Sequence, residues 1–324
     1  MLKAGIIGLG VGEQHIEGFE RDKLALVTHL CDFDEEKIQY LKDKYPDKVV
    51  IEDPSELIEN QNLDVISIAS FDNFHYEQII KCIVNGKHIF VEKPMCLTKE
   101  QLDDIKLKLP EDLLIASNLI LRQTPRFKTL KQKVDNSELG DIYYIEASYD
   151  YGRVHKLTRG WRGKLKQYSV MLGGGIHLLD LVLWITKSKI KEVVSLSSDI
   201  FSKDLEMENS DFFASLVRLD NGVILKLVSN YASATPHLHQ FKVYGTKGSF
   251  FHDLNEAYYF QGRDTDCIIT QCGHKFPGVA KGDFIPNFIR SILGKEQLLM
   301  PKEELFDLMY NSFLIEDNLK NDGK

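Results

Sequence analysis

Apolar residues in the first 120 positions come in short runs rather than in long periodic stretches. Six of these runs are candidate strands: residues 4–8, 25–31, 49–51, 64–69, 88–92 and 113–118. Most are too short for helices and rich in valine and isoleucine, as is typical of parallel strands buried on both faces. The pattern therefore predicts a parallel sheet in the first third of the chain.

Helix signals fall between these runs. Asp53 precedes Pro54, which places a capping residue before a proline at the first helical position. An apolar stripe over residues 79–84 stops at Gly86, a residue common just after a helix. Residues 98–101 have the spacing of a capping box. Repeated strand–helix–strand units imply a right-handed, doubly wound arrangement.

After about residue 120 the pattern changes to long alternating stretches, at residues 142–151, 211–219 and 223–230. Residues 220–222 (Asp-Asn-Gly) join the last two and predict a tight hairpin. A second hairpin is expected around the Gly-Thr-Lys-Gly sequence at residues 245–248, and an amphipathic helix at 303–320. This part is expected to be a second α/β domain with a large, mainly antiparallel open sheet.

Bulk properties narrow the function classes. A chain of 324 residues predicts two domains. The net charge of −8 argues against nucleic-acid binding, which needs a clustered basic surface. There is no signal-peptide pattern and no apolar window of roughly 20 residues, so we expect a cytoplasmic protein without a membrane partner. The five scattered cysteines are expected to be reduced thiols.

The first candidate chemistry is a glycine-rich turn after the first run, Gly8-Leu9-Gly10-Val11-Gly12. The dinucleotide fingerprint places its third glycine five residues after the first, where this chain has Glu13. A turn one residue shorter, with Gly12 in the third role, restores the pattern. The alternative is a glycine turn in an α/β protein that binds no cofactor.

Asp32 ends the second run, 24 residues after Gly8. An acidic side chain there accepts hydrogen bonds from the adenosine ribose hydroxyls and repels a 2′-phosphate. Phe33 adds nothing that would bind a phosphate. The sequence therefore favours NAD over NADP.

With these marks the chain resembles the Gfo/Idh/MocA family, which includes glucose–fructose oxidoreductase and inositol dehydrogenase. The resemblance rests on the glycine turn with His15, on Asp32, on residues 70–75 and on Glu92-Lys93-Pro94, which matches the family's signature tripeptide. Downstream, residues 161–163 (Trp-Arg-Gly) are followed by residues 173–180 (Gly-Gly-Gly-Ile-His-Leu-Leu-Asp), which resemble the family's glycine-rich segment. The order and spacing of these pieces make the match specific.

The resemblance implies a Rossmann domain over residues 1–120 that binds NAD. It also implies a substrate-binding and oligomerisation domain over residues 121–324, with a homodimer or homotetramer formed through the second sheet. In the family, a lysine at Lys93 and a histidine at His177 lie beside the reacting carbon. Lysine needs its pKa lowered before it can act as a base at neutral pH, whereas histidine needs little tuning. Either one could be the base. A surface lysine after a strand is the alternative interpretation of Lys93.

One departure concerns proton transfer. Many family members carry an aspartate four residues before the histidine, where this chain has Gly173. Asp180, three residues after His177, could share a helix face with it and replace the missing carboxylate, or could serve in packing alone. A substrate group could also take the role, or the reaction could differ.

Other residues complete the candidate site. Arg162, beside Trp161, is a candidate for binding a polar or anionic substrate together with Lys93, His177 and Asp180. The predicted cofactor-binding residues are Gly8, Gly10, Val11, Gly12, Asp32, Ser70, His75, Glu92, Lys93 and Asn118. The pairs His237/His239 and Cys272/His274 lack further ligands at zinc-site spacing, so no metal is expected.

The predicted function is NAD-dependent oxidation or reduction of a hydroxyl carbon on a sugar, cyclitol or nucleotide sugar. Two alternatives stay open. One uses NAD transiently to cleave or eliminate a glycoside with no net redox change. The other is a non-catalytic NAD-binding regulator, which would need neither Lys93 nor His177.

Overall fold

The computed structural model describes residues 1–158, 160–165, 169–203, 210–254, 256–262 and 266–320. By internal contacts the chain forms two compact units. The first comprises Met1–Ile120 with Ala280–Met309, and the second comprises Leu121–Val279 with Tyr310–Lys324. A late segment of the chain therefore packs with the first 120 residues. The division of binding roles at residue 120 stays a prediction.

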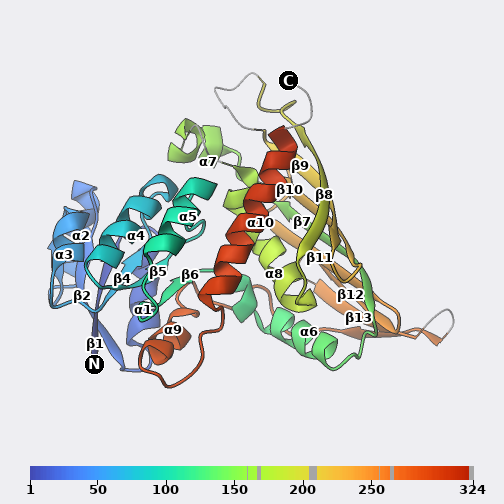
Figure 1. The fold of residues 1–324 in the computed structure, drawn as a ribbon, viewed down its shortest axis with the longest axis horizontal. Coiled ribbons are helices and arrows are strands. Elements are labelled where there is room, and N and C mark those ends of the chain that lie inside the picture. The colour runs from blue at the N-terminus through green and yellow to red at the C-terminus, as the bar shows by residue number, and fades with distance from the viewer. Residues whose placement is uncertain (159, 166–168, 204–209, 255, 263–265, 321–324) are drawn as a thin grey trace. The chain divides into compact units, whose positions relative to one another are not determined.

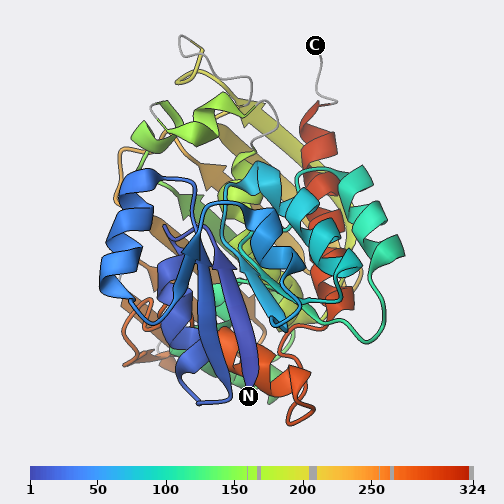
Figure 2. The same cartoon turned by 90° about the vertical axis from the view of Figure 1, so that its left-hand side faces the viewer.

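The first unit contains a six-stranded parallel sheet (Figure 2). Its spatial order is β3 (Val49–Ile51), β2 (Ala25–Cys31), β1 (Leu2–Ile7), β4 (Val65–Ile68), β5 (His88–Val91) and β6 (Ile115–Ser117). All six predicted strands are present, within one or two residues at most ends. The order reverses between β1 and β4, the topological switch point at which Rossmann sheets bind ligands beyond the strand ends. The predicted doubly wound sheet is confirmed.

Local signals in the sequence set the helices of this unit. Asp34, Asp53 and Thr98 each accept a hydrogen bond from a backbone N–H of the helix that they cap. The helices of the unit are α1 (His15–Glu20), α2 (Glu35–Lys44), α3 (Pro54–Glu59), α4 (His75–Val84), α5 (Lys99–Lys108) and α9 (Ile285–Ile292), with short 3₁₀ turns η1 (Gly12–Gln14) and η2 (Asp72–Phe74). The caps predicted at Asp53 and Thr98 are confirmed.

The second unit is built on an eight-stranded mixed sheet (Figure 1). Its order is β14 (Ile268–Gln271), β13 (Glu256–Gln261), β12 (Gly248–Asp253), β11 (Leu238–Gly245), β7 (Ile142–Asp150), β10 (Ile224–Asn230), β9 (Phe212–Leu219) and β8 (Ile190–Ser198). The pairing of β10 with β7 is parallel, and the six other pairings are antiparallel. The expectation of a large, mainly antiparallel sheet is confirmed.

Helices cover one face of this sheet. α8 (Ile176–Thr186) is buried along most of its length and packs on β7. It is preceded by a π-helical turn, η5 (Met171–Gly175), which contacts β7 and β10. The other helical segments are α6 (Pro125–Asp135), α7 (His155–Thr158), η3 (Ile120–Gln123) and η4 (Trp161–Lys164); α10 (Lys302–Lys320) spans the division between the units. None of the helices in the described part of the chain combines the length and apolar content that crossing a bilayer requires.

Candidate functional site

The glycine turn after β1 has three glycines in three different environments. Gly8 has a φ of +83°, and a Cβ there would lie 2.4 Å from the Ala69 carbonyl oxygen. Gly10 faces open space, with no atom within 4 Å of an added Cβ. At Gly12 a Cβ would lie 2.9 Å from the Ile6 side chain. These are the three demands of a dinucleotide turn: a tight bend, room for the pyrophosphate and close helix–strand packing. The residues present fit the shortened turn inferred from the sequence.

Asp32 lies against this turn. Its carboxylate accepts a hydrogen bond from the Leu9 backbone N–H at 2.7 Å and another from the Asp34 N–H at 3.2 Å. The residue is nearly buried at the end of β2. Because a carboxylate has lone pairs beyond those that these two bonds use, Asp32 can also accept from ribose hydroxyls. Phe33 is exposed and meets Phe71 edge-on, with ring centroids 5.5 Å apart.

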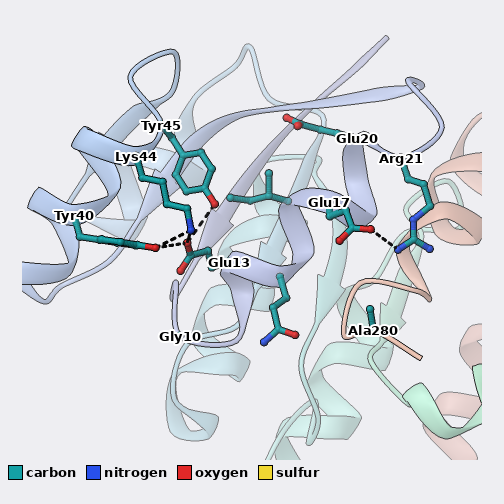
Figure 3. Close-up of a pocket in the computed structure, with 11 residues that line it drawn as sticks. Gly10, Glu13, Glu17, Glu20, Arg21, Tyr40, Lys44, Tyr45 and Ala280 are labelled. Carbon is teal, nitrogen blue, oxygen red and sulfur yellow. Dashed lines mark hydrogen bonds and ion pairs between the residues drawn. The ribbon is translucent and has the colours of Figure 1, made fainter. Parts of the chain in front are cut away.

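An open cavity of about 700 Å³ begins at Gly10 and is lined by residues of α1 and α2 (Figure 3). The Glu13 carboxylate lines this cavity. It accepts hydrogen bonds from Lys37 at 2.7 Å and from Lys44 at 2.8 Å. The hydroxyls of Tyr40 and Tyr45 also donate to it, each at 3.2 Å. Burial alone would raise the pKa of the Glu13 carboxyl, but the two lysines lower it to about 2. Two of the three α2 lysines, Lys37 and Lys44, are thus charge-paired with Glu13.

Glu92, at the carboxyl end of β5, belongs to a buried hydrogen-bond network. His15 lies with Nε2 3.2 Å from the Glu92 carboxylate and Nδ1 2.9 Å from the Ser67 hydroxyl. Asn118 donates to Glu92 at 2.7 Å and to the Lys281 carbonyl at 2.9 Å. Burial would raise the pKa of Glu92, yet the hydrogen bonds from His15 and Asn118 lower it to about 2. This network fixes the backbone just before Lys93, which is half-buried.

His75 contacts the residue that follows Lys93. It is fully buried at the start of α4, with Nδ1 2.7 Å from the Pro94 carbonyl and Nε2 3.1 Å from the Ser70 carbonyl. The Ser70 hydroxyl donates to Gln78 at 2.7 Å. His75 therefore ties the loop after β4 to the residue after Lys93.

His177 lies in the second unit, near the start of α8, and is 8% exposed. Asp180 lies one turn later. Its carboxylate accepts hydrogen bonds from Nε and Nη2 of Arg122 at 2.9 and 2.7 Å, and both side chains are buried. A carboxylate engaged in this way favours the packing role that the sequence left open. The role of Asp180 toward substrate stays a prediction.

The residues facing His177 come from the sheet and were not singled out for this role in the sequence. The His239 ring lies 6.1 Å from the His177 ring and 4.9 Å from those of Tyr149 and His237. The Tyr149 hydroxyl shares a hydrogen bond with His237 Nε2 at 3.0 Å. Tyr149 and His239 face each other because they pair across β7 and β11. Strand register, which the sequence does not reveal, creates this cluster.

The remaining candidates are more scattered. Arg162 lies over the Trp161 ring, 4.4 Å from its centroid, in η4. Within the described residues, no three His, Cys, Asp or Glu side chains converge as a metal site would require. The structure thus groups Gly8, Gly12 and Asp32 around one turn, and Glu92, Asn118 and His75 around Lys93. Lys93 and His177 belong to different units, and their pairing stays a prediction.

Comparison with known proteins assigns the chain to a family. Residues 2–115 match a family model described as an oxidoreductase family with an NAD-binding Rossmann fold. Residues 127–251 match a GFO/IDH/MocA C-terminal domain. The chain belongs to the Gfo/Idh/MocA family. As a family member it is an NAD-dependent oxidoreductase, and the resemblance inferred from the motifs is confirmed.

Individual relatives agree with this assignment. Myo-inositol 2-dehydrogenase of Thermotoga maritima is 25% identical over 263 residues, which are 78% of this chain and 75% of that protein. Two solved structures share the fold. Scyllo-inositol dehydrogenase from Lactobacillus casei, with NAD(H) and scyllo-inositol bound, has a TM-score of 0.82, with 20% identity and coverage of 99% and 98%. Levoglucosan dehydrogenase, in complex with NADH and levoglucosan, has a TM-score of 0.86, with 17% identity and coverage of 98% and 97%.

Proposed function

We propose that this Gfo/Idh/MocA oxidoreductase exchanges a hydride between NAD and a hydroxyl carbon of a cyclitol, a sugar or a nucleotide sugar. The names of its relatives, which act on inositols and on levoglucosan, support this substrate class. The observation that carries the proposal is the network around Glu92. It anchors Lys93 just past β5, at the edge of the sheet where the switch point lies.

In this proposal the glycine turn and Asp32 hold the cofactor. Gly10 and Val11 give the pyrophosphate room to approach the backbone, and Asp32 accepts from the ribose hydroxyls. The Ser70 loop, which His75 fixes, and Asn118, which orients Glu92, complete the binding surface. When bound, NAD supplies the acceptor for the hydride.

Lys93 and His177 handle the proton of the substrate hydroxyl. An imidazole titrates near neutral pH, so His177 suits the role of base, and the Lys93 ammonium then donates a hydrogen bond that orients the hydroxyl. Arg162 and Asp180 are the remaining candidates for contact with substrate. Asp180 would act through the Arg122 pair rather than as a free carboxylate.

We also propose that the protein is a cytoplasmic homo-oligomer, either a dimer or a tetramer, assembled through the second sheet. Val194, Leu196 and Leu216 are each more than half exposed on β8 and β9. An exposed apolar patch on a sheet is typical of a contact between subunits. Light scattering tests this, and a monomer at micromolar concentration would contradict it.

The catalytic assignment is tested by screening cyclitols, sugars and nucleotide sugars with NAD and following absorbance of NADH. Wild type should reduce NAD with at least one of them. Products that form without NADH would instead support transient redox chemistry with glycoside cleavage, the alternative that the missing carboxylate at Gly173 leaves open. NAD binding without any turnover across the screen would favour a regulator.

A further inference from the structure

The cluster of Tyr149, His237 and His239 continues from His177 toward solvent. His177 and His239 are both 8% exposed, whereas His237 is partly exposed. The three imidazoles follow one another with ring centroids 6.1 and then 4.9 Å apart. Exposure thus increases only at His237, which is the member of the series that reaches solvent.

The neighbouring residues hold these rings in place. Tyr149 lies edge-on to both His237 and His239, stacks on Tyr151 and bonds His237 through its hydroxyl. The glycines before His177 make this possible, since a Cβ on Gly174 would lie 2.2 Å from the Tyr149 ring. The triple-glycine segment thus allows Tyr149 to pack against the turn that leads into His177.

The proposed reaction requires a proton route. Oxidation of a secondary alcohol to a ketone breaks the C–H and O–H bonds; the hydride leaves with its two electrons to the cofactor, and the hydroxyl proton must reach water. A histidine that accepts this proton in a buried position must pass it on before the next turnover. The aspartate that many family members carry for proton relay is absent at Gly173, and Asp180 is engaged by Arg122.

We infer that His239 and His237 relay this proton from His177 to solvent, in place of the missing aspartate. His177 gives its proton to His239, which releases one from its other ring nitrogen to His237 and from there to water. Where two ring nitrogens lie beyond direct hydrogen-bond distance, a bridging water can carry the proton between them. Tyr149 is a positioning residue, since it orients His237. This inference rests on the proposed role of His177.

A titration without cofactor or substrate tests the coupling directly. Three titratable side chains have ring contacts with His239: Tyr149, His237 and His177. Coupled imidazoles titrate as a set, so ¹⁵N NMR of the apo protein should show His177 with more than one inflection. In H239N the curve of His177 should collapse to a single inflection. An identical curve in wild type and H239N would overturn the relay.

Kinetics then test the route itself. H239N and H237A should each lower kcat about tenfold or more while KM for NAD stays unchanged, because a proton step is slowed and not binding. Imidazole added to H237A, at the solvent end of the series, should restore at least part of the lost rate. Full activity in H237A without imidazole would contradict the route. H274Q, at an exposed histidine of the same unit, should retain the wild-type rate.

Failure of this inference can be separated from failure of the proposed function. If wild type oxidises a polyol and H177N is inactive, but H239N and H237A are as fast as wild type, only the relay is wrong. If no substrate is oxidised, the NMR titration of the apo protein still tests the coupling. Y149F removes only the hydroxyl bonded to His237 and keeps all three histidines, so its result does not depend on whether the histidine variants fold. It should show a smaller loss of kcat than H237A.

Discussion

At the scale of single residues, the glycine turn shows how three identical residues meet three demands. Gly8 is required by its left-handed backbone and by the Ala69 carbonyl, and Gly12 by the side chain of Ile6. Gly10 has no such constraint within the protein. The proposed reason for a glycine here is therefore the cofactor and not the fold, and this stays a prediction.

Alanine at Gly8 and at Gly10 should therefore act differently. G8A should destabilise the fold by roughly 2 kcal/mol or more, since it adds a Cβ at positive φ and against a backbone oxygen. G10A should keep the stability of wild type but bind NAD at least tenfold more weakly, because its methyl occupies the approach of the pyrophosphate. Urea unfolding and calorimetric NAD titration measure both. Equal NAD affinity in G10A and wild type would contradict the assignment of Gly10.

Glu13 is expected to contribute to cofactor choice. It neutralises Lys37 and Lys44, two of the three lysines of α2, which would otherwise attract the 2′-phosphate of NADP. Figure 3 shows Lys44 beside Glu13. E13Q should raise affinity for NADP severalfold and change affinity for NAD little. E17Q is the matched control, because Glu17 lines the same cavity but pairs with Arg21 instead. A ratio of NAD to NADP affinity that is the same in E13Q and wild type would refute this role.

At the scale of elements, the π-helical turn η5 packs tightly on the strands beneath it. Gly174 and Gly175 allow the turn to approach Tyr149 and Phe213 closely, and α8 follows with His177 in its first turn. The position of His177 thus depends on how η5 packs on β7. A larger residue at this contact should therefore displace His177.

G174A should lower stability by about 1–3 kcal/mol, because its methyl forces the Tyr149 ring to move. G273A is the matched control in the same unit, since a Cβ there would meet no atom within 4 Å. Thermal unfolding of both variants measures the difference. A melting temperature of G174A equal to that of G273A would show that the contact is not tight.

The sequence predicts elements where burial gives a regular pattern. The six parallel strands and the caps at Asp53 and Thr98 follow from short apolar runs and local chemistry. β8, β13 and β14 are not predicted; in β8 and β14 most residues are exposed and the alternation is weak. The shortened turn ending at Gly12 could be read from spacing alone.

The site could be predicted only in part, because half of it depends on long-range placement. Glu92 and Asn118 lie at the ends of neighbouring strands, so their proximity follows from sheet topology, but the contribution of His15 to their network needs coordinates. His237 and His239 raise a metal hypothesis in the sequence. The register of β7 and β11 places His239 against Tyr149, and the His237 ring also lies against Tyr149.

At the scale of the whole molecule, two buried or partly buried carboxylates make stability depend on pH. The pKa values of Glu13 and Glu92 are both lowered to about 2. A carboxyl with a lowered pKa in the folded state adds stability above its unfolded value near 4.5, and this stability is lost as the pH falls toward 2. The protein should therefore lose stability on acidification within this window.

For Glu92 the loss should be roughly 3 kcal/mol over the full window. Urea unfolding at pH 6 and at pH 3 measures the part of this loss that falls above pH 3. E92Q, which has no ionisable group at this position, should be less stable than wild type at pH 6 but should lose less between the two pH values. Equal losses in E92Q and wild type would mean that Glu92 is not held ionised by its partners.

The central claim is that Lys93 orients a polyol hydroxyl beside bound NAD while His177 accepts its proton. The most direct measurement compares NADH formation by wild type and K93M on a substrate found by the screen, with NAD affinity measured in parallel. The expected result is turnover by wild type, a loss of at least a hundredfold in kcat for K93M with NAD affinity intact, and normal turnover for K99M, at an exposed lysine of α5. K93M that turns over as fast as wild type would contradict the claim.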